Sequence, residues 1–421
     1  MAASCASAEN LALAFDAGTT TLAGSLLDTA SGLRLASASA PNPQREYGAD
    51  VVSRMEAAHR SPGSAQRLSS LLTLELQRLG SLLLEECGAP WGRVGSVGIA
   101  ANTAVTHLLL GLPVKSLIFP PHRPPSTGSR KVSTASVGWE RDIPAFVFPL
   151  PGGFVGGDAV AFLHAELRPG ETSLFLDIGT NSEIALSTPG GILATAAAAG
   201  PALEGGNLAC GMAAVPGAVR GVSIDGDRVR LDTIGGGRPS GLCGSGVVEA
   251  ISQLRRAGII DAGGALLPPG EVPTLAGVRV VERDGAAAFL LYRDAGGELL
   301  LTQEDIRQAQ LAKGAIRAGI EVLLERAGVP EEGVERLVVT GAFGAGLSPA
   351  GLKTLGIVSA KMIDICAFAG EGALRGVEAA LRSGGSEEVE KLAASIRVIP
   401  LSGTPSFERH FLRQLDFPDV S

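Results

Sequence analysis

Tyrosine and tryptophan are scarce in this chain of 421 residues, with two of each, and charged residues make up only 19% of it. No run of about 18 or more apolar residues occurs, so we expect no membrane-spanning segment. The opening stretch has no basic region followed by an apolar core, so we expect no signal peptide. The net charge of −8 and the lack of a long Lys/Arg run argue against nucleic acid as the main partner.

Cysteines are few, odd in number and scattered, at Cys5, Cys87, Cys210, Cys243 and Cys366. None forms a C-x-x-C pair, so the sequence predicts neither a zinc site nor an iron–sulfur cluster. Unpaired cysteines of this kind favour a reducing, cytoplasmic setting. Glycine is abundant instead: its 57 copies are nearly twice the average usage of about 7%. We interpret this excess as many tight turns and close approaches of backbone to ligand.

One pattern occurs twice along the chain. An apolar strand is followed by Asp, any residue, Gly and Thr, and then by a second strand, in FDAGTT (15–20) and again in LDIGTN (176–181). A third short strand follows each copy, at 33–39 and at 191–197. We interpret the repetition as an internal duplication of one β-meander lobe. Helical and strand patterns alternate elsewhere, which indicates an α/β protein with mixed sheets.

Several helices are predicted from apolar spacing and capping signals. The expected helices cover 158–167, 244–257, 303–327 and the Leu-striped region from Leu68 to Leu83. Thr302 and Asp305 form a capping-box start for the third of these. Strands are expected near 277–283 and 288–292. Residues 113–150 are rich in proline and are predicted to be an irregular but ordered surface excursion.

The chemistry of the two repeated hairpins points to phosphate and magnesium. A carboxylate at the end of a buried strand packs poorly but is a good ligand for Mg²⁺ or its waters. In the first copy Asp16 fills that place, Gly18 allows the turn, and the hydroxyl groups of Thr19, Thr20 and Thr21 can help to cradle phosphate.

The second copy supplies Asp177, Gly179, Thr180 and Asn181. A single hairpin of this kind could equally well be a plain β-turn. The presence of two copies favours a role in binding phosphate and magnesium. Two facing hairpins would grip the phosphates of a nucleotide, while the two acids hold Mg²⁺ and orient the attacking water. That arrangement suits phosphoryl transfer.

Two further segments carry weaker signals. Asp158 in GGDAVAFL is either a helix cap or a carboxylate that polarises water near the terminal phosphate. Gly341 and Gly344 in VTGAFGAG leave room for a base or ribose against the backbone. An ordinary strand-to-helix turn would explain these two glycines as well.

The order of these motifs resembles the superfamily of actin, sugar kinases, acetate kinases and heat-shock chaperones. More specifically, eight strings resemble the ATPase region of reductive activators of corrinoid proteins. They are NPQREYGADVVSRM (42–55), AANTAVTHLLLGLP (100–113), FVGGDAVAF (154–162), LDIGTNSEIAL (176–186), AGPALEGGNLACGM (199–212), GLCGSGVVEAI (241–251), TQEDIRQAQLAKGAI (302–316) and VVTGAFGAGL (338–347).

This resemblance implies an actin-like ATPase of the α/β class, with two ribonuclease-H-like lobes whose mixed β-sheets flank a nucleotide cleft. The first lobe would cover 11–168, with a Pro-rich insertion at about 113–152. The second would cover 169–421, with an insertion at about 200–300. Residues 1–10 would be a disordered tail.

The resemblance also implies an activity and further site residues. Activators of this kind use ATP to drive the one-electron reduction of an inactive Co(II) corrinoid (cobalamin-type) protein to nucleophilic Co(I), which serves a methyltransferase system. Gly244, Ser245 and Gly246 would lie near the adenosine end of the site, together with Gly341 and Gly344. Lys313 would approach the nucleotide from the polar side of its helix, although a solvated surface lysine is the simpler interpretation.

Long members of that family carry a ferredoxin-like iron–sulfur domain ahead of the ATPase. Here the first hairpin begins at residue 15, so the electron is expected to come from a separate ferredoxin or reductase. A homodimer is the default oligomer that the resemblance implies.

Three alternatives stay open. The chain could be a small-molecule kinase of the same fold, with Asp158 or Asp177 as the base. It could be a nucleotide sensor or scaffold without turnover. It could also activate a different low-potential metalloenzyme.

Overall fold

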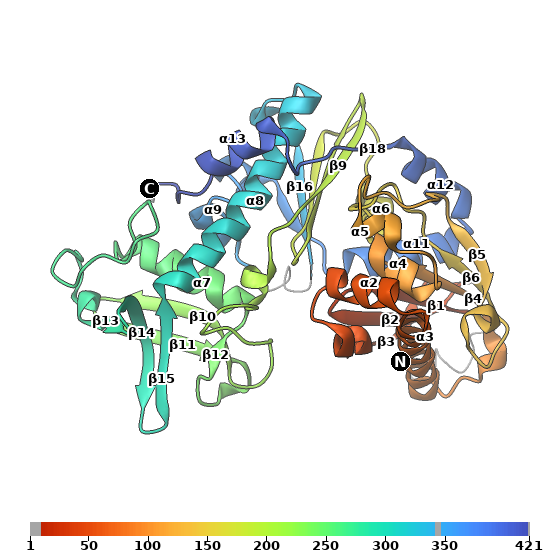
Figure 1. The fold of residues 1–421 in the computed structure, drawn as a ribbon, viewed down its shortest axis with the longest axis horizontal. Helices are drawn as coiled ribbons and strands as arrows, with labels where there is room; N and C mark the ends of the chain where they lie inside the picture. Colours follow the sequence, from red (N-terminus) through yellow and green to blue (C-terminus); the bar gives the residue numbers. More distant parts are fainter. Residues whose placement is uncertain (1–9, 342–346, 420–421) are drawn as a thin grey trace. The chain divides into compact units, whose positions relative to one another are not determined.

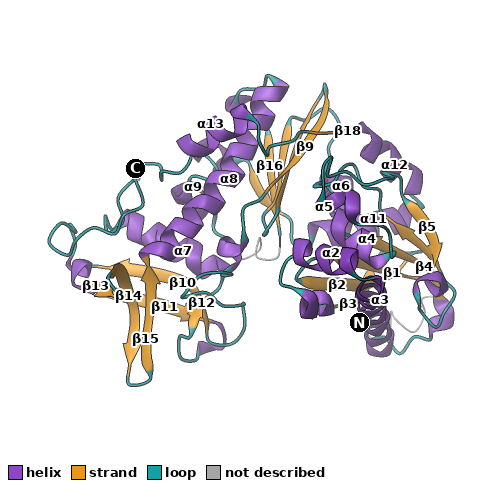
Figure 2. Cartoon of the chain, in the orientation of Figure 1, coloured by secondary structure: helices purple, strands orange, loops and turns teal. Residues whose placement is uncertain are grey.

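The computed structural model describes residues 10–341 and 347–419, and these form two compact units (Figures 1 and 2). Unit 1 comprises Met1–Pro169 and Glu371–Val398, and unit 2 comprises Gly170–Gly370 and Ile399–Ser421. The segment Glu371–Val398, which we expected in the second lobe, therefore packs with the N-terminal part of the chain. Of the expected tail 1–10, all but Asn10 lies outside the described residues, as does Gly344.

The sheet of unit 1 has the strand order β3-β2-β1-β4-β6-β5. The three N-terminal strands form an antiparallel meander, β4 runs parallel to β1, β6 runs parallel to β4, and β5 is antiparallel to β6. Their bounds are β1 Leu11–Ala17, β2 Thr21–Asp28, β3 Arg34–Pro41, β4 Val94–Ala100, β5 Arg130–Ser133 and β6 Pro144–Val147.

Helices cover both faces of this sheet. A side chain at Gly80 of α3 would contact Leu13, whereas a side chain at Gly98 of β4 would contact Val377 of α11. Because side chains alternate across a strand, α3 and α11 lie on opposite faces. The helices of unit 1 are α2 Val51–Arg60, α3 Pro62–Glu86, α4 Thr103–Leu109, α5 Lys115–Ile118, α6 Gly157–Glu166, α11 Gly372–Ser383 and α12 Ser386–Ser395, with 3₁₀ turns at Pro43–Tyr47, Trp91–Arg93 and Thr134–Val137; strand β18 (Ile396–Val398) ends the unit.

The prediction for 113–150 was wrong in part. We expected an irregular surface excursion, but β6 lies inside the sheet next to β4, and Ala145, Val147 and Phe148 are buried. The four-residue strand was hidden among prolines, because Pro144 begins it at a position where no ladder hydrogen bond is required.

Five strands of the main sheet of unit 2 repeat the arrangement, in the order β17-β16-β7-β8-β9. Here too the first three strands are an antiparallel meander, and the next two run parallel to the first. This is the topology that the duplicated sequence pattern predicts. The bounds are β7 Ser173–Asp177, β8 Ser182–Thr188, β9 Gly191–Ala197, β16 Arg336–Thr340 and β17 Cys366–Phe368.

Two small sheets and a long helix complete unit 2. The sheets are β11-β10-β12 and β13-β14-β15. Their strands are β10 Ala218–Asp225, β11 Arg228–Thr233, β12 Gly241–Leu242, β13 Val280–Arg283, β14 Ala286–Asp294 and β15 Gly297–Thr302. The helices are α7 Gly244–Arg256, α8 Gln303–Ala327, α9 Pro349–Leu355, α10 Ala360–Asp364 and α13 Pro405–Arg413, with 3₁₀ turns at Pro201–Glu204, Ile234–Gly236, Leu275–Arg279 and Glu331–Gly333.

Helix α8 confirms the prediction for 303–327. The Thr302 hydroxyl accepts from the backbone N–H of Asp305, and the Asp305 carboxylate accepts from the N–H of Thr302, so both halves of the capping box are present. Its apolar stripe from Ile306 to Leu323 is buried. The strand expected from residue 277 begins only at Val280, because Leu275–Arg279 forms a 3₁₀ turn.

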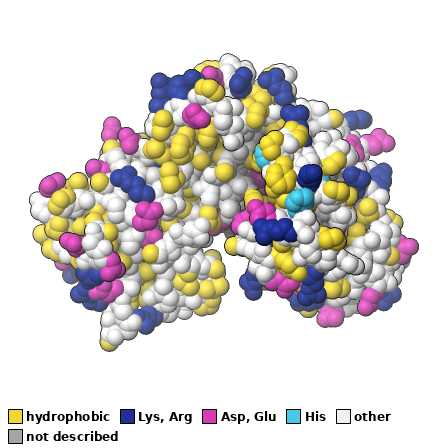
Figure 3. All heavy atoms as spheres, viewed as in Figure 1, with side chains coloured by type: hydrophobic (Ala, Val, Ile, Leu, Met, Phe, Trp, Pro, Cys, Tyr) yellow, Lys and Arg dark blue, Asp and Glu magenta, His cyan; other side chains and the backbone are white. Residues whose placement is uncertain are grey.

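Charges of both signs are interspersed on the face drawn in Figure 3. Within 10–341 and 347–419, no helix has the length and apolarity needed to cross a membrane.

Candidate functional site

The first hairpin lies at the end of the central strand of unit 1. Asp16 is paired in register with Ala23 on β2 and Ala100 on β4, and its side chain is half-buried. The turn that follows needs glycine, because a Cβ on Gly18 would lie 2.6 Å from the carbonyl oxygen of Thr21. Thr20 and Thr21 are exposed at the tip and Thr19 is half-buried, so two of the three threonines predicted to meet phosphate are accessible.

Three side chains that the sequence analysis did not single out hold this hairpin. Asn42 Nδ2 donates to the Gly18 carbonyl at 2.9 Å, and Asn102 Nδ2 donates to Thr19 Oγ1 at 2.9 Å. Arg54, only 1% exposed, donates through a guanidinium nitrogen to the Thr19 carbonyl at 2.7 Å. All three occur in strings that support the family resemblance, but their contact with the hairpin depends on the fold.

Asp158 is brought to the same end of the unit 1 sheet. The backbone N–H groups of Gly157 and Asp158 donate to the Ala101 carbonyl at 2.8 and 3.3 Å, which holds the start of α6 against the end of β4. The N-cap is Gly156, so the alternative in which Asp158 caps the helix is wrong. Burial raises the pKa of Asp158 to about 6, even though its Oδ1 accepts from the Ala159 N–H at 2.8 Å.

The second hairpin has the equivalent position in unit 2. Asp177 is paired with Glu183 on β8 and with Thr340 at the end of β16. Gly341 follows β16 with φ +123°, and a Cβ there would lie 2.3 Å from the Ile178 carbonyl oxygen. The structure therefore brings Gly341 against this hairpin.

A carboxylate that we did not predict contacts the hairpin. The Thr180 hydroxyl donates to Glu204 Oε2, and the Gly200 N–H donates to the Thr180 carbonyl at 2.9 Å. Burial raises the pKa of Glu204, and the hydrogen bonds from Thr180 partly offset that shift. The only sequence signal was its place in AGPALEGGNLACGM.

The start of α7 lies beside Glu204. A Cβ on Gly244 would be 2.3 Å from the Leu203 carbonyl oxygen, and one on Gly246 would be 2.0 Å from the Val219 carbonyl oxygen. These glycines are thus required for close packing, and Ser245 between them is buried. The Asp177 hairpin, the Glu204 turn and Gly244–Gly246 form one continuous cluster within unit 2.

The structure corrects the prediction for Lys313. It was expected on the polar side of α8, near the nucleotide or in solvent, but it is 0% exposed. Its ammonium donates to the Asp416 carbonyl and lies 5.3 Å from the centre of the Phe417 ring. Burial lowers its pKa to about 8. Because the ammonium is held by the C-terminal segment, we leave Lys313 out of the site.

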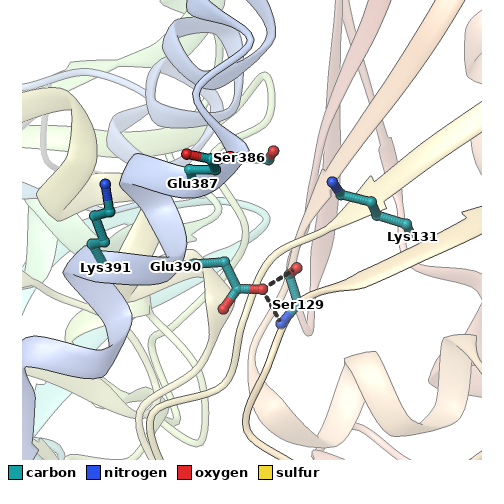
Figure 4. Close-up of a pocket in the computed structure, with 6 residues that line it drawn as sticks. All are labelled: Ser129, Lys131, Ser386, Glu387, Glu390 and Lys391. Carbon is teal, nitrogen blue, oxygen red and sulfur yellow. Dashed lines mark hydrogen bonds between the residues drawn. The ribbon is translucent and has the colours of Figure 1, made fainter.

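A separate pocket of about 270 Å³ in unit 1 involves none of the predicted residues (Figure 4). Glu390 of α12 accepts there from the Ser129 N–H at 3.0 Å. The lining consists of Ser129, Lys131, Ser386, Glu387, Glu390 and Lys391.

Both halves of the chain match described protein families. The C-terminal ASKHA domain of RACo matches residues 171–421, and the RACo middle region matches residues 11–167. The chain belongs to the RACo family. ASKHA denotes the actin-like ATPase fold, so the predicted fold class is confirmed.

Relatives of this RACo-family chain are named for corrinoid activation. It is 31% identical over 344 residues to "Corrinoid activation enzyme RamQ" of Eubacterium limosum, which covers 79% of this chain and 57% of the relative. It is 26% identical to "[Co(II) methylated amine-specific corrinoid protein] reductase" of Methanosarcina barkeri, over 62% of this chain and 49% of that protein. This chain therefore spans about half the length of these curated relatives.

A solved structure covers nearly the whole chain. "Reductive activator for corrinoid,iron-sulfur protein" superimposes with a TM-score of 0.85 at 29% identity, over 99% of this chain and 67% of that one.

The side chains present fit a nucleotide-borne magnesium ion. Among the described residues, no three or more His, Cys, Asp or Glu side chains gather as ligands for a resident metal. Mg²⁺ that arrives with a nucleotide needs only one or two carboxylates, since phosphates and waters fill its other positions. Asp16 and Asp177, each at the end of a central strand, are suited to that role.

Proposed function

We propose that this chain is a Mg-ATP-dependent activator that drives the reduction of a corrinoid protein from Co(II) to Co(I). One observation carries the proposal. Two RACo regions together match 11–167 and 171–421, and each places an Asp–x–Gly–Thr hairpin at the end of its central strand. The electron comes from a donor on another chain, a ferredoxin or a reductase, and the proposed setting is the cytoplasm.

With Lys313 left out, the predicted residues have proposed tasks at the nucleotide. Asp16 and Asp177 hold Mg²⁺ through water, and the ion neutralises phosphate charge. The hairpin backbones, that of Thr180 included, and the side chains of Thr19, Thr20, Thr21 and Asn181 bind phosphate oxygens. Asp158 orients the attacking water. Gly244–Gly246 and Gly341 pack against the adenosine end, and Gly344 keeps that assignment as a prediction outside the described residues.

ATP is proposed to act through conformation. A ligand shifts an equilibrium only by its differential affinity for the two states. Moving a partner-competent state from 1:99 to 99:1 takes about 5.5 kcal/mol of differential binding. Hydrolysis of ATP to ADP and phosphate then resets the chain, while the donor loses one electron and Co(II) gains it.

The test combines the purified chain with a Co(II) corrinoid protein and a low-potential reductant, and follows Co(I) by its absorption. We expect Co(I) to accumulate only with Mg-ATP. Asp16→Asn and Asp177→Asn should each lower ATP turnover at least about a hundredfold, as expected when a group that organises phosphoryl transfer is lost. The matched control is Asp28→Asn. Asp28 is a carboxylate at the end of β2 that accepts hydrogen bonds from Ala30 and Ser31 in the turn that follows it.

Two outcomes would contradict the proposal. One is Co(I) formation that does not depend on ATP, and the other is normal ATP turnover in either hairpin variant. Transfer of the phosphoryl group to a metabolite without any protein partner would instead identify a kinase of the same fold.

A further inference from the structure

The bond between Thr180 and Glu204 sets the direction of a hydroxyl group in the second hairpin. Thr180 Oγ1 is the donor and Glu204 Oε2 the acceptor. We propose that Glu204 is a positioning residue that fixes the Thr180 hydroxyl so that its lone pairs accept a hydrogen bond at the nucleotide site. This inference rests on the function proposed above.

A threonine hydroxyl has one proton and two acceptor lone pairs, and a carboxylate can only accept. Once the proton of Thr180 is directed to Glu204, the hydroxyl has no proton to offer to a phosphate oxygen. It can only accept, and the species with protons to give at such a site is water. Thr180 would therefore orient the attacking water rather than bind phosphate through its side chain.

The turn that carries Glu204 is closely packed within unit 2. Gly205, which follows it, has φ +78°, and a Cβ there would lie 2.8 Å from the Met212 carbonyl oxygen. The same loop is tied to α8, since Asp305 Oδ1 accepts from the Ala209 N–H at 2.6 Å and Asp305 is 2% exposed. With α7 packed against Leu203, the turn is fixed before any ligand binds, which keeps the hydroxyl direction constant.

The chemical step that this positioning would assist is the hydrolysis of ATP. The oxygen of water bonds to the terminal phosphorus, the bridging oxygen leaves with ADP, and the protons of water pass to the phosphate product and to solvent. Neither Thr180 nor Glu204 gains or loses an atom, so the pair affects the rate through orientation alone.

The experiment compares ATP turnover in Glu204→Met, which removes the acceptor, and Glu204→Gln, which keeps a carbonyl acceptor without the charge. We expect Glu204→Met to lower kcat about tenfold, or about 1.4 kcal/mol, with KM for ATP within about threefold of the original. Glu204→Gln should recover part of the loss. Glu325→Gln is the control, because Glu325 also accepts from a hydroxyl, that of Ser406, at 2.6 Å.

A double-mutant cycle decides whether Glu204 acts through Thr180. In a Thr180→Val background, Glu204→Met should change neither kcat nor the affinity for a fluorescent ATP analogue any further. Additive losses would overturn the inference, as would a Glu204→Met variant with unchanged kcat. If the unmodified chain neither binds nor hydrolyses ATP, the proposed function itself fails. That result differs both from additive losses and from an unchanged kcat in Glu204→Met.

Discussion

At the scale of single residues, Asp158 combines a stability penalty with a proposed role in turnover. Burial raises its pKa from 3.8 to about 6. Between these values the folded chain binds more protons than the unfolded chain, so this group lowers stability as pH rises through that window. The full penalty is present above pH 6, where the group would be an ionised base.

We therefore predict that Asp158→Asn stabilises the protein at pH 7 while it reduces ATP turnover. Because the Asp158 side chain is only half-buried, we expect the free energy of unfolding to rise by about 1–2 kcal/mol. The full free-energy equivalent of the pKa shift would be larger. Asn can still accept from the Ala159 N–H. Thermal midpoints at pH 4 and pH 7 provide the measurement, and the gain should vanish at pH 4.

Asp28→Asn is the control of opposite sign. The Ser31 hydroxyl lowers the pKa of Asp28, so its ionised form stabilises the fold and the variant should lose stability at pH 7. Equal midpoints for Asp158→Asn and the unmodified protein at pH 7 would contradict the argument for Asp158.

At this scale the sequence predicted those residues whose roles are set by close neighbours along the chain. Asp16, Gly18, Asp177 and Gly179 could be predicted because one turn defines their roles. Glu204 could not, because its partner Thr180 is 24 residues away. Lys313 was misplaced because its environment is made by residues about 100 positions later in the chain.

At the scale of elements, α6 and α11 cross at unusually short range. A Cβ on Gly376 would lie 1.7 Å from the Ala161 carbonyl oxygen. That contact is far below any van der Waals distance, so the two helices would have to move apart to admit even a methyl group. The crossing fixes α11 on the unit 1 sheet, where Glu378 accepts from Ser25 at 2.6 Å and pairs with Arg34.

Gly376→Ala should consequently destabilise unit 1 by about 2–3 kcal/mol or more through overpacking. In an unconstrained helix the same change would stabilise by up to about 1 kcal/mol. Gly63→Ala in α3 is the matched control, because its nearest contact is the Ser61 hydroxyl at 3.6 Å. Urea unfolding measures both, and equal loss in the two variants would argue against the close crossing.

Helices and strands were predicted correctly where the local sequence pattern was strong. The predictions failed where packing against distant residues determines the secondary structure. The heptad-like leucines of α3 and the capping box of α8 specify their helices locally. By contrast, β6 has four residues, starts with Pro144 and is a strand only because β4 lies beside it. That Glu371–Val398 packs with unit 1 depends on the α6–α11 crossing, which no local pattern encodes.

At the scale of the whole molecule, the duplicated sheet gives each unit one Asp–x–Gly–Thr hairpin at the end of its central strand. Neither unit alone supplies both carboxylates that the proposal assigns to magnesium. Binding of one nucleotide should therefore depend on both units, and its free energy should appear in the stability of the entire chain.

We predict that saturating Mg-ATP raises the free energy of unfolding by about 2.7 kcal/mol at one hundred times Kd. Either Asp16→Asn or Asp177→Asn alone should remove most of that gain, although the two residues lie in different units. Asp28→Asn should keep the gain. Differential scanning fluorimetry over a range of Mg-ATP concentrations measures these shifts, with EDTA as the metal-free reference. If one hairpin variant retained the full shift, the nucleotide would bind through a single unit, and the assignment of both carboxylates to one magnesium ion would be wrong.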